Sequence, residues 1–193
     1  MSLLTPMLRS SPLTDWFSDV QRVQGMLDFE AALAQAQAAC GMVPPEAVGP
    51  IVAACRHEAI DFAALGEAAV GAGNLAIPLV KQLTAQVKAQ DPEAARYVHW
   101  GATSQDAIDT GLVLQLRGAL DAAETLLEQL LAALALQADR YRDTVMPGRT
   151  WMQHALPVTF GLKLAGTLDA LLRWQQRLRE MRPRLLVLQF GGA

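Results

Sequence analysis

The chain has 193 residues and a formal net charge of −3, from 16 Lys and Arg against 19 Asp and Glu. That length suits one domain, or one domain and part of another, with a substantial core. The charge is spread evenly, which argues against a nucleic-acid-binding protein because such proteins need a clustered basic face. The apolar fraction is 52%, yet no apolar run approaches the roughly 18 residues of a membrane-spanning helix. We therefore expect no membrane span and, because the first residues resemble no signal peptide, a cytoplasmic protein.

The sequence predicts neither a metal nor a cofactor. Cys40 and Cys55 have no second cysteine pair near them, so a zinc site or a disulfide framework is not expected. His57, His99 and His154 lack the spacing of metal ligands. The segment GAGNLA matches the dinucleotide fingerprint, but the residues before it are helical in character, whereas that fingerprint requires a preceding strand. The basic residues between Arg173 and Arg184 are interpreted as the polar side of a helix end.

Helical periodicity dominates the chain, and the alternation typical of strands is almost absent. A first helix is expected from Asp15 as its cap to Gly41 as its stop, with an apolar stripe at Trp16, Val20, Val23 and Leu27. A second helix should begin after Pro44 and Pro45 and end near His57, and a third should begin near Asp61. A fourth should carry Pro78 in its first turn and end before Asp91. These short helices predict a small N-terminal helical domain over residues 1–103.

A long helix is predicted over residues 104–142, because apolar residues form two stripes along it. One stripe follows three-four spacing and the other repeats every seven residues: Val113, Leu116, Leu120, Ala123, Leu127, Leu130, Leu134 and Tyr141, then Leu112, Ala119, Leu126 and Ala133. At 1.5 Å per residue the helix is about 55 Å long, longer than the roughly 40 Å diameter of a compact chain of this size. It must therefore pack against later helices or against copies of itself.

A second long helix is expected from Pro157 to just before Pro183, which completes an all-α fold class. Residues 104–193 are then the first part of a central long-helix bundle that forms a homo-oligomer. The chain closes on an apolar, strand-like run from Leu185 that ends in glycine. We interpret this ending as truncation, with the rest of the bundle and a C-terminal domain absent.

Two polar breaks flank the long helix. The first leads through His99 and Gly101 to Thr103 and Ser104 at the helix N-terminus, where free backbone N–H groups suit a carboxylate or phosphate. The alternative is that Thr103 or Ser104 merely caps the helix. The second break carries Arg149, Thr150, Gln153 and His154 before another helix start. The long helix separates the two breaks by its full length, so one chain cannot bring them together, whereas an antiparallel neighbour from another subunit could.

The segments GATSQDAIDTG (Gly101 to Gly111) and GRTWMQHALPVT (Gly148 to Thr159) resemble the first two signature regions of the fumarase/aspartase superfamily. Its members add or eliminate across a bond beta to a carboxylate. With GNLAIPLVKQL and RPRLLVLQFGGA, these segments are most similar to the lactonizing branch, which closes a ring within a tricarboxylic diene. The resemblance implies a small polycarboxylate substrate and a homotetramer whose active sites combine three subunits. It places a third signature loop, with a serine and a lysine, beyond Ala193.

The resemblance also implies roles for individual residues. Thr103, Ser104, Thr150 and Gln153 match substrate-binding positions, and Arg149 lies beside the last two. Trp151 stands where many relatives have a histidine, and we expect it to line the pocket as an apolar wall. Asn74 stands where adenylosuccinate lyases carry another histidine, and it is included among the substrate-binding candidates.

His99 and His154 are the catalytic candidates, as proton donors or as groups that orient the substrate. A lysine beyond Ala193 remains an equal candidate for the proton donor. Two other interpretations stay open: a sibling lyase that acts on succinyl-type adducts, and a non-catalytic, oligomerising helical module.

Overall fold

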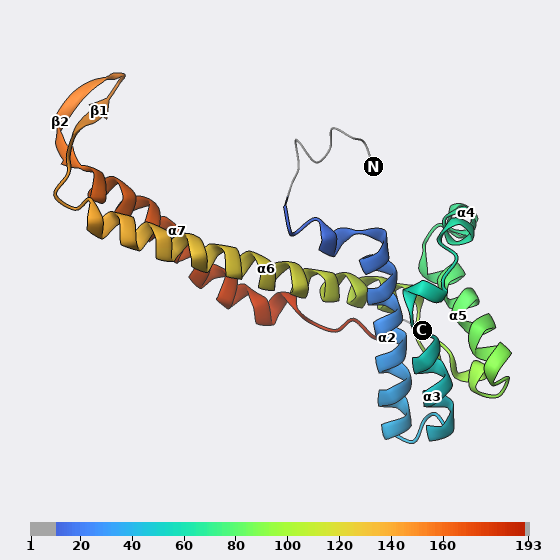
Figure 1. Ribbon diagram of the computed structural model, residues 1–193. Helices are drawn as coiled ribbons and strands as arrows, with labels where there is room; N and C mark the ends of the chain where they lie inside the picture. The colour runs from blue at the N-terminus through green and yellow to red at the C-terminus, as the bar shows by residue number, and fades with distance from the viewer. Residues whose placement is uncertain (1–10, 192–193) are drawn as a thin grey trace. The chain divides into compact units, whose positions relative to one another are not determined.

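The computed structural model describes residues 11–191, which are mostly helical, and the one sheet among them is a two-stranded hairpin (Figure 1). The predicted all-α fold class is confirmed. The chain forms two compact units, one made of the residues up to Ala119 together with those from Leu186, the other of Leu120–Leu185. The predicted division after residue 103 concerns the domains of a complete protein and stays a prediction.

The first unit contains the short helices and the beginning of the long one. In chain order they are η1 (Asp15–Phe17), α2 (Asp19–Ala39), α3 (Pro45–Ala54), η2 (His57–Ala59), α4 (Phe62–Ala72), α5 (Ala76–Gln90), η3 (Ala94–Tyr97) and the first part of α6 (Ser104–Arg140). The predicted starts at Pro45 and after Asp61, and the end of α5 before Asp91, are confirmed. The second helix is shorter than expected, because α3 ends at Ala54 and a separate 3₁₀ turn holds His57.

The ends of α2 follow from side-chain and backbone capping. Its N-cap is Ser18, whose hydroxyl accepts the Gln21 N–H at 3.3 Å, and not Asp15 as predicted. Asp15 instead begins the separate turn η1. At the other end Gly41 has φ +71 and donates to the Ala38 carbonyl, while the Met42 N–H donates to the Gln37 carbonyl. These two bonds make a Schellman motif, so the predicted stop at Gly41 is correct.

The core of the first unit lies around α2, α3 and α5. Leu27, Ile51, Leu79 and Leu83 are all fully buried. The long helix crosses α2 at two glycines, since a Cβ on Gly25 would lie 2.7 Å from the Gly111 carbonyl oxygen. The close crossing therefore requires that neither residue has a side chain.

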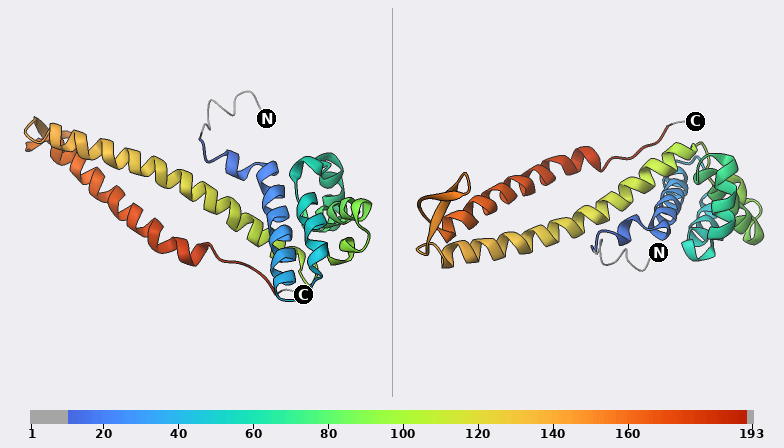
Figure 2. Two further views of the ribbon diagram at one scale, coloured as in Figure 1. Left: turned by 60° about the horizontal axis from the view of Figure 1, so that its bottom comes forward. Right: turned by 90° about the horizontal axis from the view of Figure 1, so that it is seen from above.

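The second unit contains the rest of α6, the strands β1 (Val145–Thr150) and β2 (Gln153–Thr159), and α7 (Phe160–Leu185). Within this unit α7 runs beside α6 (Figure 2). Gly161 permits their approach, because a Cβ there would lie 2.5 Å from the Ala138 carbonyl oxygen. In the last turn of α7, Arg182 contacts Asp121 and Glu124 of α6.

The hairpin corrects two predictions, the near absence of strands and a helix start at Pro157. β1 pairs antiparallel with β2, and Pro157 lies opposite Pro147. Proline donates no backbone hydrogen bond. In a two-stranded sheet each strand has one unpaired edge, so the two prolines remove few hydrogen bonds between the strands. A bulge follows at Gly148, where a Cβ would lie 2.5 Å from the Leu156 carbonyl oxygen.

The end of α7 and the tail differ from the prediction as well. Pro183 lies inside α7, which continues to Leu185. So close to the helix end, proline removes one backbone hydrogen bond without displacing a following turn. Residues 187–191 form no strand. Gln189 is held in the first unit, where the Thr110 hydroxyl donates to its carbonyl at 3.0 Å and accepts its N–H at 3.2 Å.

Candidate functional site

The N-terminus of α6 is closed by a carboxylate of its own first turn. Asp106 has an exposed fraction of 0%, and its Oδ2 accepts the Thr103 N–H at 3.0 Å. The Asp106 N–H in turn donates to the Thr103 carbonyl at 3.0 Å. The Ser104 hydroxyl makes no hydrogen bond within residues 11–191. The cap is therefore made without Ser104, whose half-buried hydroxyl is available to a ligand.

His99 lies in the turn before α6 and contacts a buried carboxylate on α2. Its Nδ1 is 2.5 Å from Oε1 of Glu30, a residue with an exposed fraction of 2%. The backbone at His99 has φ +58, a left-handed conformation that non-glycine residues adopt rarely. Gly101 follows with φ +67. The turn thus places an imidazole within a few residues of the first N–H groups of α6.

Sequence reasoning missed Glu30, although a signal for it was present. Glu30 continues the apolar stripe of α2 beyond Val23 and Leu27, at a position where an apolar residue is expected. A charged residue there is buried at a large cost unless it has a partner.

Asn74 lies in the bend between α4 and α5. Its Oδ1 accepts the Ile77 N–H at 3.1 Å, so it satisfies one free donor at the start of α5. Asn74 also lines a cavity of about 390 Å³ together with Arg22 and Gln115. The side-chain amide N–H₂ of Asn74 makes no hydrogen bond in the described part of the chain.

The second group of predicted residues lies at the tip of the hairpin in the second unit. The register places Arg149 opposite His154 and Thr150 opposite Gln153, and all four side chains are exposed. The connecting residues Trp151 and Met152 have φ +44 and +64, as in a type I′ turn. Trp151 is 94% exposed. Within the described residues it therefore forms no apolar wall, and its expected place in a substrate pocket stays a prediction.

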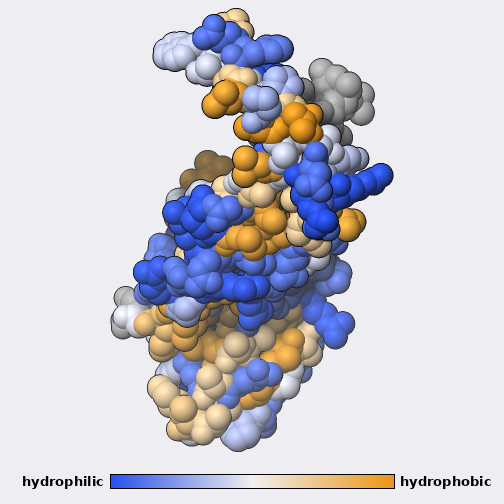
Figure 3. Space-filling view, turned by 90° about the vertical axis from the view of Figure 1, so that its left-hand side faces the viewer, coloured by the Kyte–Doolittle hydropathy of each residue, from blue (hydrophilic) through white to orange (hydrophobic). Residues whose placement is uncertain are grey.

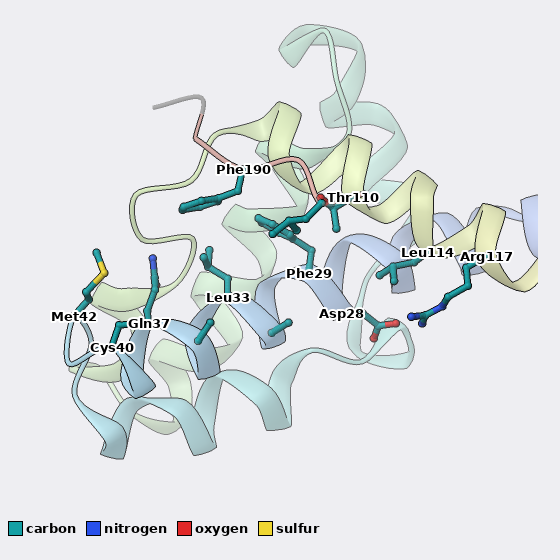
Figure 4. A pocket seen from close by; sticks show the side chains of 13 residues that line it. Asp28, Phe29, Leu33, Gln37, Cys40, Met42, Thr110, Leu114, Arg117 and Phe190 are labelled. Carbon is teal, nitrogen blue, oxygen red and sulfur yellow. The ribbon is translucent and has the colours of Figure 1, made fainter. Parts of the chain in front are cut away.

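Another cavity of the first unit is lined by none of the predicted site residues. It has a volume of about 540 Å³ and lies between α2, α6 and the tail (Figure 4). Phe29, Leu33 and Phe190 form its apolar middle, and Asp28 and Arg117 lie at one end of it (Figure 4).

Cys55 is buried and does not offer a reactive thiolate, whereas Cys40 is exposed. Burial, and after it the negative charges of Glu30 and Asp28, raise the pKa of the Cys55 thiol to about 12. The thiol is therefore protonated near neutral pH and is a poor nucleophile. Residues 11–191 contain no cluster of His, Cys, Asp and Glu that could hold a metal ion. No helix among them is long and apolar enough to cross a membrane.

Comparison with known proteins places these residues in a family. A family model described as Lyase matches residues 8–193. The 3-carboxy-cis,cis-muconate cycloisomerase of Pseudomonas aeruginosa is 64% identical over 184 residues, which are 95% of this chain and 40% of that protein. The protein of the same name from Bradyrhizobium diazoefficiens is 54% identical over 191 residues, 99% of this chain and 42% of that protein.

A solved structure shows the same fold. The crystal structure of 3-carboxy-cis,cis-muconate lactonizing enzyme from Pseudomonas putida superposes with a TM-score of 0.96 at 58% identity, over 100% of this chain and 44% of that one. The chain spans about two fifths of the length of the curated relatives that it matches.

Proposed function

The chain belongs to the lyase family, and we propose that it forms one part of a cycloisomerase that converts 3-carboxy-cis,cis-muconate to 4-carboxymuconolactone. The observation that carries this proposal is the 64% identity to the P. aeruginosa cycloisomerase over 95% of the chain. Both polar groups described above fall within the aligned family residues 8–193.

The reaction is an internal addition. One substrate carboxylate oxygen forms a C–O bond to a carbon of the conjugated diene, and a proton adds to the neighbouring carbon. No atom leaves, and one double bond is lost. As the C–O bond forms, negative charge moves onto the carboxylate conjugated with the protonated carbon, which gains enolate character. Hydrogen-bond donors directed at that carboxylate therefore lower the barrier more than donors elsewhere.

The first turn of α6 is the proposed site for one substrate carboxylate, bound by Thr103, Ser104 and free backbone N–H groups. Asp106 already offsets part of the positive end of the helix dipole. A substrate anion at this place consequently needs a further positive or donating group. Asn74 is the proposed additional donor from this subunit, and Arg149, with Thr150 and Gln153, is the proposed partner from the hairpin of another subunit.

This arrangement requires an assembly, and we propose a homotetramer in the cytoplasm, built through the long helices. The two polar groups are separated in the chain by α6, which has 37 residues. The tip of the hairpin is exposed in the single chain, including Trp151. In the assembly Trp151 would cover the reacting diene and exclude water from it.

A chimera tests the proposal. The chain is joined to the remaining sequence of the P. aeruginosa relative, so that it replaces the segment to which it is 64% identical. We expect the purified chimera to consume 3-carboxy-cis,cis-muconate, measured as loss of the diene ultraviolet absorption, and to form the lactone, identified by NMR. The P. aeruginosa enzyme is the positive control.

The same preparation distinguishes the proposed cycloisomerase from a sibling lyase that acts on succinyl-type adducts. A folded, tetrameric chimera that leaves the muconate unchanged and releases fumarate from a succinyl-type adduct would contradict the proposed function. A tetramer with neither activity would favour a module that only assembles.

A further inference from the structure

Two buried polar side chains of α2 form hydrogen bonds with the turn before α6. Glu30 contacts the His99 ring, and seven positions further along α2 the Gln37 Nε2 donates to the Trp100 carbonyl at 2.6 Å. Both residues are buried. Two consecutive residues of the turn are therefore fixed: His99 through its side chain and Trp100 through its backbone carbonyl.

The contact between Glu30 and His99 is short and shielded from water. Nδ1 and Oε1 are 2.5 Å apart, and the His99 side chain is 17% exposed. A hydrogen bond with an ionised partner is shorter and stronger than one between neutral groups. The other carboxylate oxygen of Glu30, Oε2, has no hydrogen-bond partner within residues 11–191. Among the described residues, His99 is thus the one hydrogen-bond partner that offsets the free-energy cost of burying the Glu30 carboxylate.

A carboxylate accepts hydrogen bonds and does not donate them, so the proton in this contact belongs to Nδ1 of His99. That assignment fixes the tautomer of the neutral ring, with Nδ1 protonated and Nε2 carrying the free lone pair. Nε2 is then the ring nitrogen that can receive a proton and pass it on. His99 has a positive φ and lies in a turn that leads to the proposed carboxylate site.

We propose that Glu30 is a positioning residue that acts through His99 and makes Nε2 the nitrogen that donates to the substrate. The inference rests on the proposed function, because it takes the carboxymuconate as the ligand of the α6 N-terminus. When the Nε2 proton passes to the substrate carbon, His99 returns to its neutral form with the proton on Nδ1. Water then supplies the next proton at Nε2. His154, exposed on the hairpin, has no carboxylate contact in the described residues.

The tautomer is measured on the 193-residue chain itself, whether or not that chain is active. Long-range ¹H–¹⁵N NMR distinguishes the two neutral forms, and the chain has 3 histidines. We expect His99 to carry its proton on Nδ1. His57 is expected to do the same, because its Nδ1 lies 3.0 Å from Gln24 Oε1. Exposed His154 is the reference for the ring in water.

Substitutions on the same helix separate the role of Glu30 from a general effect. In Glu30→Leu the side chain that accepts the Nδ1 proton is removed, and we expect the Nδ1-protonated population of His99 to fall while His57 stays unchanged. Gln24→Leu is the matched control, which should alter His57 and leave His99 as it was. Circular dichroism checks that each variant is folded. If Glu30→Leu does not fold, Glu30→Asp replaces it, and a shorter carboxylate should weaken the same signal.

The kinetic test uses the active chimera. We expect Glu30→Leu to lower kcat about 100-fold, the lower end of what a positioned acid contributes, with little change in KM, and Glu30→Asp to recover part of the loss. Gln24→Leu should leave both constants unchanged. Equal tautomers in Glu30→Leu and the parent chain, or a full kcat in Glu30→Leu, would overturn the inference while the proposed function stands. An inactive parent chimera would instead overturn the proposed function, and the tautomer result would still decide the structural role of Glu30.

Discussion

Thr103 and Ser104 are neighbours in sequence but differ in their structural roles. Thr103 forms the cap with Asp106 through its backbone, so helix stability depends on this pair. Ser104 is the first residue of α6, and its hydroxyl takes no part in the cap. The alternative interpretation, in which Ser104 only caps the helix, thus has little support in this geometry.

We therefore predict that Ser104→Ala in the chimera lowers turnover without lowering stability. A hydrogen bond to a charged group contributes about 1.5–3 kcal/mol, which corresponds to a loss on the order of 10- to 100-fold in kcat/KM. The melting temperature and the tetramer should be unchanged. Thr125→Ala is the control, since it removes a hydroxyl from an exposed turn of the same helix. Loss of stability by about 1 kcal/mol with unchanged turnover would identify Ser104 as a cap.

Trp151 and Met152 occupy a turn that glycine and asparagine form more easily. Both have positive φ, which costs an ordinary residue roughly 1 kcal/mol or more. Replacing Trp151 by Asn and Met152 by Gly should thus protect the β1–β2 amides more strongly in hydrogen exchange. The same double variant of the chimera should lose most of its lactonizing activity, because it lacks the indole proposed to cover the diene.

Met152→Gly alone is the control for that double variant. It relieves one strained residue and keeps Trp151, so activity should be retained. A double variant that remains fully active would remove Trp151 from the proposed pocket.

The site residues differ in how far the sequence could predict them. The groups around Ser104 and Arg149 stand out as polar clusters beside helix ends, and the resemblance assigned roles to them. Glu30 was not found, because its importance depends on His99, which lies 69 positions away in the chain. Helical periodicity marks Glu30 as facing the core, but only the folded structure shows which group compensates its charge.

At the scale of elements, strong periodicity and capping residues predicted the helices well. The long helix was expected over residues 104–142 and is found at Ser104–Arg140. The hairpin was missed for a physical reason: its turn is Trp-Met, and each strand contains a proline. Neither feature is typical of strands. The two strands pair through a specific register between β1 and β2. This register cannot be predicted from helical periodicity in the sequence.

The crossing of α2 and α6 makes a prediction about stability. Gly25→Ala places a methyl group 2.7 Å from the Gly111 carbonyl oxygen, so the helices must separate. We expect the free energy of unfolding to fall by about 1–3 kcal/mol in urea denaturation followed by circular dichroism. Gly66→Ala, on α4 with no atom near the new methyl group, should instead stabilise the chain by about 0.5–1 kcal/mol. A neutral Gly25→Ala would show that the crossing tolerates a wider separation.

For the whole molecule, the exposed apolar side chains of the second unit are the main feature. The larger ones on its helices are Leu126, Leu130, Leu136, Leu162, Leu172 and Trp174. Apolar surface of this kind also interrupts the hydrophilic surface on the face drawn in Figure 3. Contiguous apolar surface on a protein in water is typical of an interaction site. Both interpretations of the chain, as part of an enzyme and as an assembly module, depend on what covers these helices.

We predict that the purified 193-residue chain associates and does not catalyse lactonization. Its mass of 20.8 kDa gives the monomer value for light scattering, and we expect a larger particle. Leu130→Lys with Leu136→Lys should shift the particle toward the monomer, because charge at these two exposed apolar positions opposes their burial. Gln129→Lys is the control, since it adds a charge at an exposed position that is already polar.

Catalysis is expected to require more than association, because the resemblance places a serine-bearing loop and a lysine outside this chain. The chimera contains the corresponding sequence and should be active under the same assay. Turnover by the 193-residue chain, in a preparation whose intact mass excludes longer species, would contradict that requirement. It would also show that the groups on α6 and on the hairpin, with His99 held by Glu30, are sufficient for the chemistry.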